Sequence, residues 1–225
     1  MLEILRAEVA TLSDQPVDYL INTHVHGDHI GNNAAFGEDG TRLISHENLR
    51  ASLANKGTHS GKKFVAAQKS SLPAITFADR MTLHINGDAI KIINFANAHA
   101  DAVIHFQHTN VIHAGDIMFN TLFPYIDRSN GGSLKGVIAA LKELSKMTDA
   151  ETKIIPGHGP LADKQDIDST VAMLEDSAAL VSGLLAEGKS DAEILKANPL
   201  SKYQAYSWAF ITTEKMTKQI LANLR

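Results

Sequence analysis

The 225-residue chain contains no cysteine. Disulfides and thiolate ligands are therefore excluded, and a metal ion would have to be held by nitrogen and oxygen donors. A basic excess is also lacking, because the formal net charge is −4, and we expect no nucleic-acid partner. No stretch approaches the roughly 20 apolar residues of a membrane span, so we expect no membrane partner either.

The composition is that of an ordinary soluble protein. Hydrophobic residues make up 44% of the chain and charged residues 20%. At this length we expect a single domain over residues 1–225, whose residues 161–225 form a C-terminal helical segment.

The N-terminus does not have the pattern of a signal peptide. Residues 1–10 include acidic side chains and lack a long apolar run, and they predict an amphipathic helix. Because the absence of cysteine fits a reducing or an oxidising compartment, the location stays open. We expect the cytoplasm by default, and the periplasm or the exterior if an N-terminal segment has been removed.

Strand and helix patterns alternate along the chain, which indicates an α/β fold. Asn86-Gly87 predicts a tight hairpin between strands 81–85 and 89–93. Further strands are expected over residues 17–22, 42–45, 102–106, 110–114 and 153–155. Helices are expected over residues 46–53, 133–147, 167–185 and 203–224, and another begins at the capping box of Ser190. Residues 56–71 predict a long exposed loop.

The run Thr23–His29 has the densest group of potential metal ligands: His24, His26, Asp28 and His29. Imidazole and carboxylate are common ligands of divalent cations. The run follows a predicted strand, and ligands usually bind beyond strand ends in open α/β sheets. A chance cluster of solvated histidines is the alternative, but so many ligands within six positions favour a metal site.

Three more candidates follow predicted strands elsewhere in the chain. They are His99, Asp116 and His158, each of which comes shortly after the end of a strand pattern. Residues at one edge of a sheet can converge, so we expect these three to join the histidine run in one site.

The order of these seven residues, in the contexts Thr-His-Val-His-Gly-Asp-His, Ala-Gly-Asp and Pro-Gly-His-Gly, resembles the metallo-β-lactamase-fold hydrolase superfamily. The resemblance covers residues 18–160, and the ligand set is similar to that of the glyoxalase II-like members. It implies a four-layer αββα sandwich and two metal ions, usually zinc, with iron or manganese as alternatives. By the same resemblance, His24, His26 and His99 hold the first ion, Asp28, His29 and His158 hold the second, and Asp116 bridges both.

The resemblance also implies a reaction class. It predicts a metal-dependent hydrolase that attacks a small-molecule ester, thioester, amide or lactam, or phosphoester with an activated hydroxide, while Asp28 orients the nucleophile or accepts its proton. An iron-dependent redox enzyme related to the sulfur dioxygenases is one alternative, although His26 stands where such di-iron relatives typically have glutamate. An inactive, truncated metal-binding module is another.

The substrate contacts are less clearly marked. Asn120, Phe123, Tyr125 and Arg128 follow Asp116 closely enough to line a pocket, and Arg128 could pair with an anionic group. Three aromatic residues near the C-terminus predict packing rather than recognition: Tyr203, Tyr206 and Trp208.

Only 23 residues precede His24, whereas relatives have several strands there. We therefore expect the usual N-terminal strands to be missing from this sandwich. An uncovered sheet edge tends to pair with another chain, so a homo-oligomer that covers this edge is expected.

Overall fold

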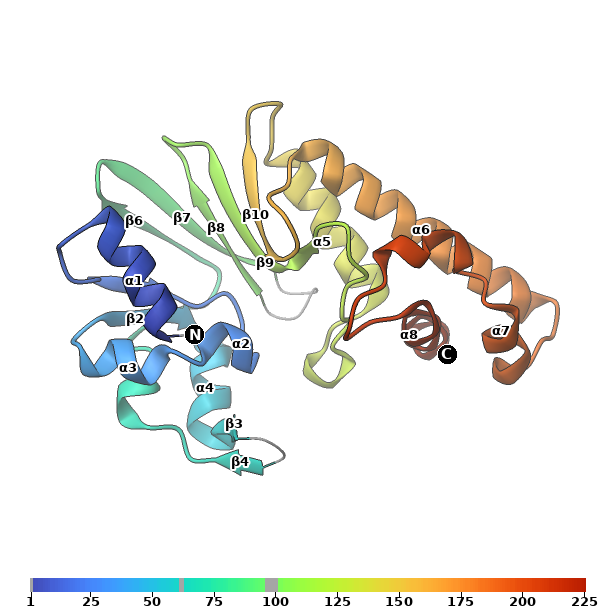
Figure 1. The fold of residues 1–225 in the computed structure, drawn as a ribbon, viewed down its shortest axis with the longest axis horizontal. Coiled ribbons are helices and arrows are strands. Elements are labelled where there is room, and N and C mark those ends of the chain that lie inside the picture. The colour runs from blue at the N-terminus through green and yellow to red at the C-terminus, as the bar shows by residue number, and fades with distance from the viewer. Residues whose placement is uncertain (1, 61–62, 96–100) are drawn as a thin grey trace. The chain divides into compact units, whose positions relative to one another are not determined.

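The computed structural model describes residues 2–60, 63–95 and 101–225, and its α/β class is the one predicted (Figure 1). The chain divides into two compact units, with the boundary after Asp79. Unit 1 contains the residues before this boundary, and unit 2 contains residues 80–225.

Unit 1 is built on a three-stranded parallel sheet in the order β1-β2-β5. The strands are β1 (Tyr19–Ile21), β2 (Arg42–His46) and β5 (Ile75–Phe77). The helices of this unit are α1 (Leu2–Leu12), α2 (Gly27–Ile30), α3 (Asn33–Glu38), α4 (Glu47–Lys56) and the short 3₁₀ helix η1 (Lys69–Ser71). Ile30, Leu49 and Leu53 form a small core that joins α2 to α4.

The N-terminal helix and the sheet edge agree with the sequence pattern. Helix α1 covers the predicted helical segment, and the Arg6 guanidinium donates to the Asp39 carboxylate beyond α3 at 2.5 Å. Strand β1 lies at one edge of its sheet. Whether a second copy of the chain covers that edge stays a prediction, which sedimentation of the purified protein would test.

The long loop expected over residues 56–71 is wrong in part. Strands β3 (Thr58–Ser60) and β4 (Lys63–Val65) pair there as an antiparallel hairpin, and η1 follows. Gly57 permits this arrangement, because its φ is +78° and a Cβ there would meet the Val65 carbonyl oxygen at 1.9 Å. Only glycine allows the chain to leave α4 this close to β4.

Unit 2 is built on a five-stranded sheet in the order β10-β9-β8-β7-β6. The strands are β6 (Arg80–Ile85), β7 (Asp88–Phe95), β8 (Asp101–Phe106), β9 (Val111–Phe119) and β10 (Lys153–His158). The predicted hairpin is confirmed, since Asn86 and Gly87 join β6 to β7 with positive φ angles of 53° and 74°. Strands β9 and β10 run parallel, and the other neighbouring pairs are antiparallel.

Helices of this unit pack on one face of the sheet and on one another (Figure 1). They are α5 (Leu134–Lys146), α6 (Lys164–Ala186), α7 (Asp191–Ala197) and α8 (Thr213–Leu224), with the 3₁₀ helices η2 (Arg128–Asn130) and η3 (Ser201–Tyr206). The core joins Ile112 and Ile154 of the sheet to Leu141 of α5 and Leu174 of α6. Ser133 and Ser190 cap α5 and α7 as predicted.

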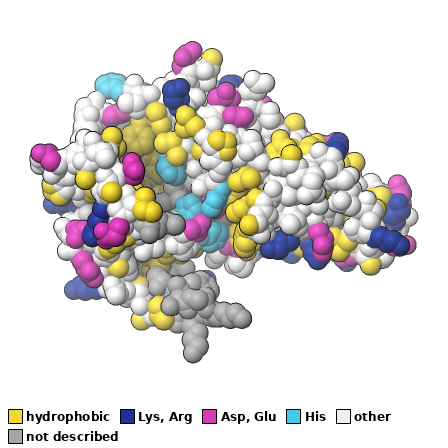
Figure 2. Space-filling view, viewed as in Figure 1, with side chains coloured by type: hydrophobic (Ala, Val, Ile, Leu, Met, Phe, Trp, Pro, Cys, Tyr) yellow, Lys and Arg dark blue, Asp and Glu magenta, His cyan; other side chains and the backbone are white. Residues whose placement is uncertain are grey.

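The surface of unit 2 shows no dominance of one charge. Acidic and basic side chains are interspersed over the visible face of its helical end (Figure 2), in keeping with the small net charge. Helix α6 is long and apolar enough to cross a membrane by length and composition alone. Its buried side chains belong to the core of unit 2.

Three predicted boundaries need correction. Strand β9 continues through Asp116 to Phe119, and β10 continues to His158, because pairing resumes after register shifts near Pro156. The single helix expected over residues 203–224 is wrong. It is interrupted after η3, where the Trp208 amide donates to the Ile211 carbonyl and Thr212 caps the separate helix α8.

Candidate metal centre

The histidine run of unit 1 connects β1 to α2. His24 and His26 lie in the connection, and Asp28 and His29 lie in the first turn of α2. The run therefore follows the carboxyl end of a parallel strand, as predicted. The short strand and the immediate helix start bring the four potential ligands together.

The imidazoles of this run converge. His24 Nε2 lies 3.1 Å from His26 Nδ1, and the ring centroids of His24 and His29 are 4.1 Å apart. His29 Nε2 lies 3.4 Å from Asp28 Oδ2. His24 is almost fully buried, with 2% of its surface exposed, whereas more than half of the Asp28 side chain is exposed.

A hydroxyl contacts the other ring nitrogen of His24. Thr23 Oγ1 lies 3.0 Å from His24 Nδ1. When Nδ1 carries the proton and donates it to Thr23, Nε2 presents its lone pair toward His26. A second hydrogen bond of this kind is how proteins orient a metal-binding imidazole.

Two buried asparagine side chains, Asn22 and Asn33, hydrogen-bond to each other next to the histidine run. Asn22 and Asn33 exchange two side-chain hydrogen bonds of 2.9 Å each. Asn22 also donates to the His29 carbonyl at 3.4 Å, and Asn33 donates to the Ser71 carbonyl at 3.3 Å. The sequence pattern did not mark Thr23, Asn22 or Asn33 as site residues, although two of them directly precede His24.

In unit 2, Asp116 and His158 lie on the parallel neighbours β9 and β10. The Asp116 side chain is 3% exposed, and its Oδ1 lies 3.5 Å from His158 Nε2. Gly157 lies against this carboxylate, since a Cβ at position 157 would meet Asp116 Oδ1 at 2.1 Å. The His158 carbonyl accepts from the Asn120 amide at 2.9 Å, which fixes the end of β10.

Two aromatic side chains contact the His158 ring, and these two rings also lie 6.1 Å apart between centroids. Phe119 stacks on it with centroids 4.9 Å apart and planes 17° apart, and Trp208 lies 5.4 Å away. Trp208 Nε1 donates to the Phe123 carbonyl at 3.0 Å, so the indole itself is held in place. The contact between Trp208 and His158 was not expected from the sequence.

Zinc provides a test of whether these donors suit a metal ion. Two nitrogens bound at about 2.0–2.1 Å to one tetrahedral zinc ion lie about 3.3 Å apart. The three donor pairs described above are separated by 3.1, 3.4 and 3.5 Å. Their spacing and their nitrogen and oxygen chemistry fit zinc, and the same donors suit iron or manganese.

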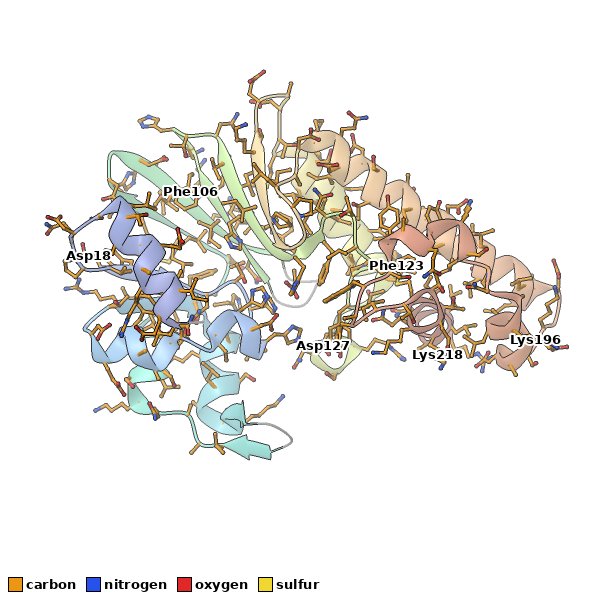
Figure 3. All side chains as sticks on the ribbon, viewed as in Figure 1. Asp18, Phe106, Phe123, Asp127, Lys196 and Lys218 are labelled. Carbon is orange, nitrogen blue, oxygen red and sulfur yellow. The ribbon has the colours of Figure 1, made fainter. Side chains whose placement is uncertain are left out.

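His99 lies outside the described residues, so its predicted role is not examined by the structure. The candidate substrate residues of unit 2 have different environments. Phe123 is fully buried in the core, and the Asn120 amide donates to the carbonyls of Pro160 and Leu161 (Figure 3 labels Phe123). Tyr125 is partly exposed, and Arg128 is exposed on η2.

The environment of Tyr125 favours its neutral form. Burial raises the pKa of the Tyr125 hydroxyl, and the charge of Asp127 raises it further. Asp127, labelled in Figure 3, caps η2 by accepting from the amides of Ser129 and Asn130. The phenol is therefore uncharged at neutral pH.

A family model of the metallo-β-lactamase superfamily matches residues 3–158. This chain belongs to the metallo-β-lactamase superfamily. No curated protein matches it. The superfamily consists mostly of metallohydrolases, so membership indicates a metal-dependent hydrolase at a coarse level and does not favour the redox alternative.

Solved structures of the superfamily share the fold. A metallo-β-lactamase from Pontibacter korlensis is 20% identical, with a TM-score of 0.64 over 77% of this chain and 76% of that one. TMB-1 is 12% identical, with a TM-score of 0.60 over 78% and 75% of the two chains. The DIM-1 metallo-β-lactamase is 14% identical, with a TM-score of 0.58 over 78% and 76%. These similarities confirm the predicted metallo-β-lactamase fold.

Proposed function

We propose that this chain hydrolyses a small-molecule ester, thioester, amide or lactam, or phosphoester at a dinuclear zinc centre. The first ion is assigned to His24, His26 and His99, and the second to Asp28, His29 and His158. Asp116 is assigned as the ligand shared by both ions. The observation that carries the proposal is the ligand-like spacing of donor pairs in each unit of a chain that belongs to a metallohydrolase superfamily.

The burial of Asp116 supports a nearby cation. A carboxylate that is 3% exposed loses most of its hydration, and such groups are normally paired or bound to a metal. Within unit 2, His158 Nε2 lies 3.5 Å from Asp116 Oδ1. A bound dication would offset the desolvation of Asp116.

Two bound dications would lower the pKa of a water molecule from 15.7 toward about 7 and polarise the oxygen of the scissile group. The protein residues supply orientation and proton transfer. Asp28 is the most exposed of the described ligands, so one of its oxygens can hold the attacking water and accept its proton. The Thr23 hydroxyl at His24 Nδ1 restricts the orientation of that ring, and Phe119 with Trp208 restricts the ring of His158.

A substrate screen with metal analysis on the same sample tests the proposal. Zinc-loaded, chelator-treated and zinc-reloaded protein would be assayed on thioesters, lactones and other esters, phosphodiesters and β-lactams. We expect turnover on at least one class, its loss on chelation and its return with about two zinc ions per chain. Turnover that survives complete removal of metal would contradict the proposal.

The same preparation separates the remaining alternatives. An iron-dependent redox enzyme would contain iron and consume oxygen, so elemental analysis and an oxygen electrode distinguish it from a zinc hydrolase. Stoichiometric zinc with no turnover on any class would instead favour the inactive metal-binding module.

A further inference from the structure

Three aromatic side chains form a continuous wall next to the candidate ligand His158. The wall consists of Trp208, Phe210 and Tyr125. Trp208 lies 5.4 Å from His158, Phe210 lies 5.7 Å from Trp208, and Tyr125 lies 5.4 Å from Phe210, all between ring centroids. Such separations are those of interacting aromatic pairs.

Core packing accounts for only part of this wall. Trp208 and Tyr125 pack against the core of unit 2, yet both stay partly exposed. Phe210 lies outside that core and 48% of it is exposed. A large exposed apolar ring that is joined through Trp208 to a candidate ligand is more informative than a single exposed apolar residue elsewhere on the surface.

Hydrogen bonds hold the Trp208 indole and the backbone next to Phe210. The Trp208 indole donates to the Phe123 carbonyl at 3.0 Å, and its amide donates to the Ile211 carbonyl at 3.0 Å. The Lys215 ammonium donates to the Phe210 carbonyl at 2.7 Å and lies 4.8 Å from the centre of that ring. The Trp208 side chain would therefore lose little conformational entropy when a ligand binds.

We propose that this wall binds an aromatic or bulky apolar acyl group of the substrate, while the scissile bond lies at the metal-binding end near His158. The inference rests on the proposed function and narrows its substrate class. The phenol of Tyr125 is neutral, so this ring places no negative charge beside the bound group. A phenylacetyl group presents an aromatic ring to the wall, whereas an acetyl group presents only a methyl group.

The single tryptophan of the chain allows a binding test that does not depend on turnover. Phenylacetate and acetate, as stand-ins for the carboxylate products, would be titrated into the zinc-loaded protein while Trp208 fluorescence is recorded. We expect phenylacetate to bind at least tenfold more tightly. Phe210→Ala should weaken phenylacetate binding about tenfold, because an aromatic contact and its buried area are lost. Acetate binding should not change.

Two variants provide controls. Phe210→Tyr keeps the ring and should retain the preference. Leu224→Ala removes an exposed apolar side chain at the far end of α8 and should have no effect. Equal affinities for the two carboxylates, or an equal loss of both in Phe210→Ala, would overturn the inference.

Turnover distinguishes this inference from the proposed function. On the ester class found in the screen, Phe210→Ala should raise KM for the phenylacetyl substrate and leave KM for the acetyl substrate unchanged, with little effect on kcat. Hydrolysis without an aromatic preference would overturn the role of the wall and leave the hydrolase assignment intact. Phenylacetate binding in a protein with no hydrolytic activity would overturn the hydrolase assignment and leave the aromatic binding surface intact.

Discussion

The Cα atom of Gly157 lies directly against the Asp116 carboxylate, so that a Cβ at position 157 would meet Oδ1 at 2.1 Å. The next contacts of that Cβ would be backbone atoms of Gly115 at 2.8 Å, which leave no direction for relief. The glycine therefore keeps open the space that the carboxylate occupies. Its φ angle is not the reason, because Gly157 is not among the positive-φ glycines.

Gly157→Ala should displace the Asp116 carboxylate and weaken zinc binding. Overpacking of this kind costs about 1–3 kcal/mol of folding stability. Zinc affinity by competition with a chromophoric chelator and thermal unfolding would measure the two effects. Gly183→Ala is the matched control, because a Cβ there has open space and should stabilise α6 by about 0.5–1 kcal/mol. Unchanged zinc affinity in Gly157→Ala would show that the space next to Gly157 does not position the Asp116 carboxylate for zinc.

Thr23→Val should weaken zinc binding by about 10–100-fold, the usual effect of removing a partner that orients a ligand. Valine keeps the shape of threonine but cannot contact His24 Nδ1 through a hydroxyl. Thr23→Ser keeps the hydroxyl and should stay close to the wild type. Isothermal titration with zinc measures both variants, and equal affinities for valine and serine would show that the hydroxyl does not matter.

Thr121→Gly should stabilise the protein by about 1 kcal/mol, because a β-branched residue in the left-handed region is strained. Thr121 has a φ of 59° and follows β9 at the start of the segment that leads to Tyr125. Chemical denaturation measures the gain. Asn198→Gly is the comparison, since Asn198 also has a positive φ of 45° but asparagine tolerates this conformation. A smaller increase in the free energy of unfolding for Thr121→Gly than for Asn198→Gly would show that the backbone at Thr121 is not strained.

The stability of unit 2 should decrease in acid through Asp176. A hydrogen bond from the Lys202 ammonium lowers the pKa of this carboxyl most, and one from the Tyr203 hydroxyl lowers it further. The stabilisation is therefore fully present above the ordinary pKa of about 3.9 and is lost as the pH falls through the lowered pKa of the folded state.

Urea denaturation of wild type and Asp176→Asn across pH 3–6 measures this contribution, where the range follows from the direction of the shift. The variant should lose stability less steeply toward low pH. Lys202→Gln removes the first cause and should have the same effect on the slope. Parallel pH profiles for all three proteins would exclude Asp176 as the source.

The elements that the sequence predicted well are determined by local chemistry. Asn86-Gly87 determines a tight turn, and Ser133 and Ser190 accept hydrogen bonds from helix amides three positions later, so nearby residues suffice. The interruption between η3 and α8 was missed because a distant contact contributes to it. Trp208 donates to Phe123, 85 positions earlier, and no local pattern reveals that partner.

The candidate site follows the same division. His24, Asp116 and His158 were found because their residue types and local contexts mark potential ligands. The contacts that surround them join separate segments: Gly157 with Asp116, Asn22 with Asn33, and Trp208 with His158. These contacts decide ligand orientation and pocket shape, and they are visible only once the chain is folded.

The zinc content of Asp116→Ala tests the central claim most directly. Wild type and Asp116→Ala, together with the surface control Asp168→Ala on α6, would be loaded with zinc, desalted and analysed for metal per folded chain. We expect about two ions in the wild type and the control, and one or none in Asp116→Ala with hydrolysis lost. Two ions and full activity in Asp116→Ala would contradict a dinuclear centre built on this carboxylate.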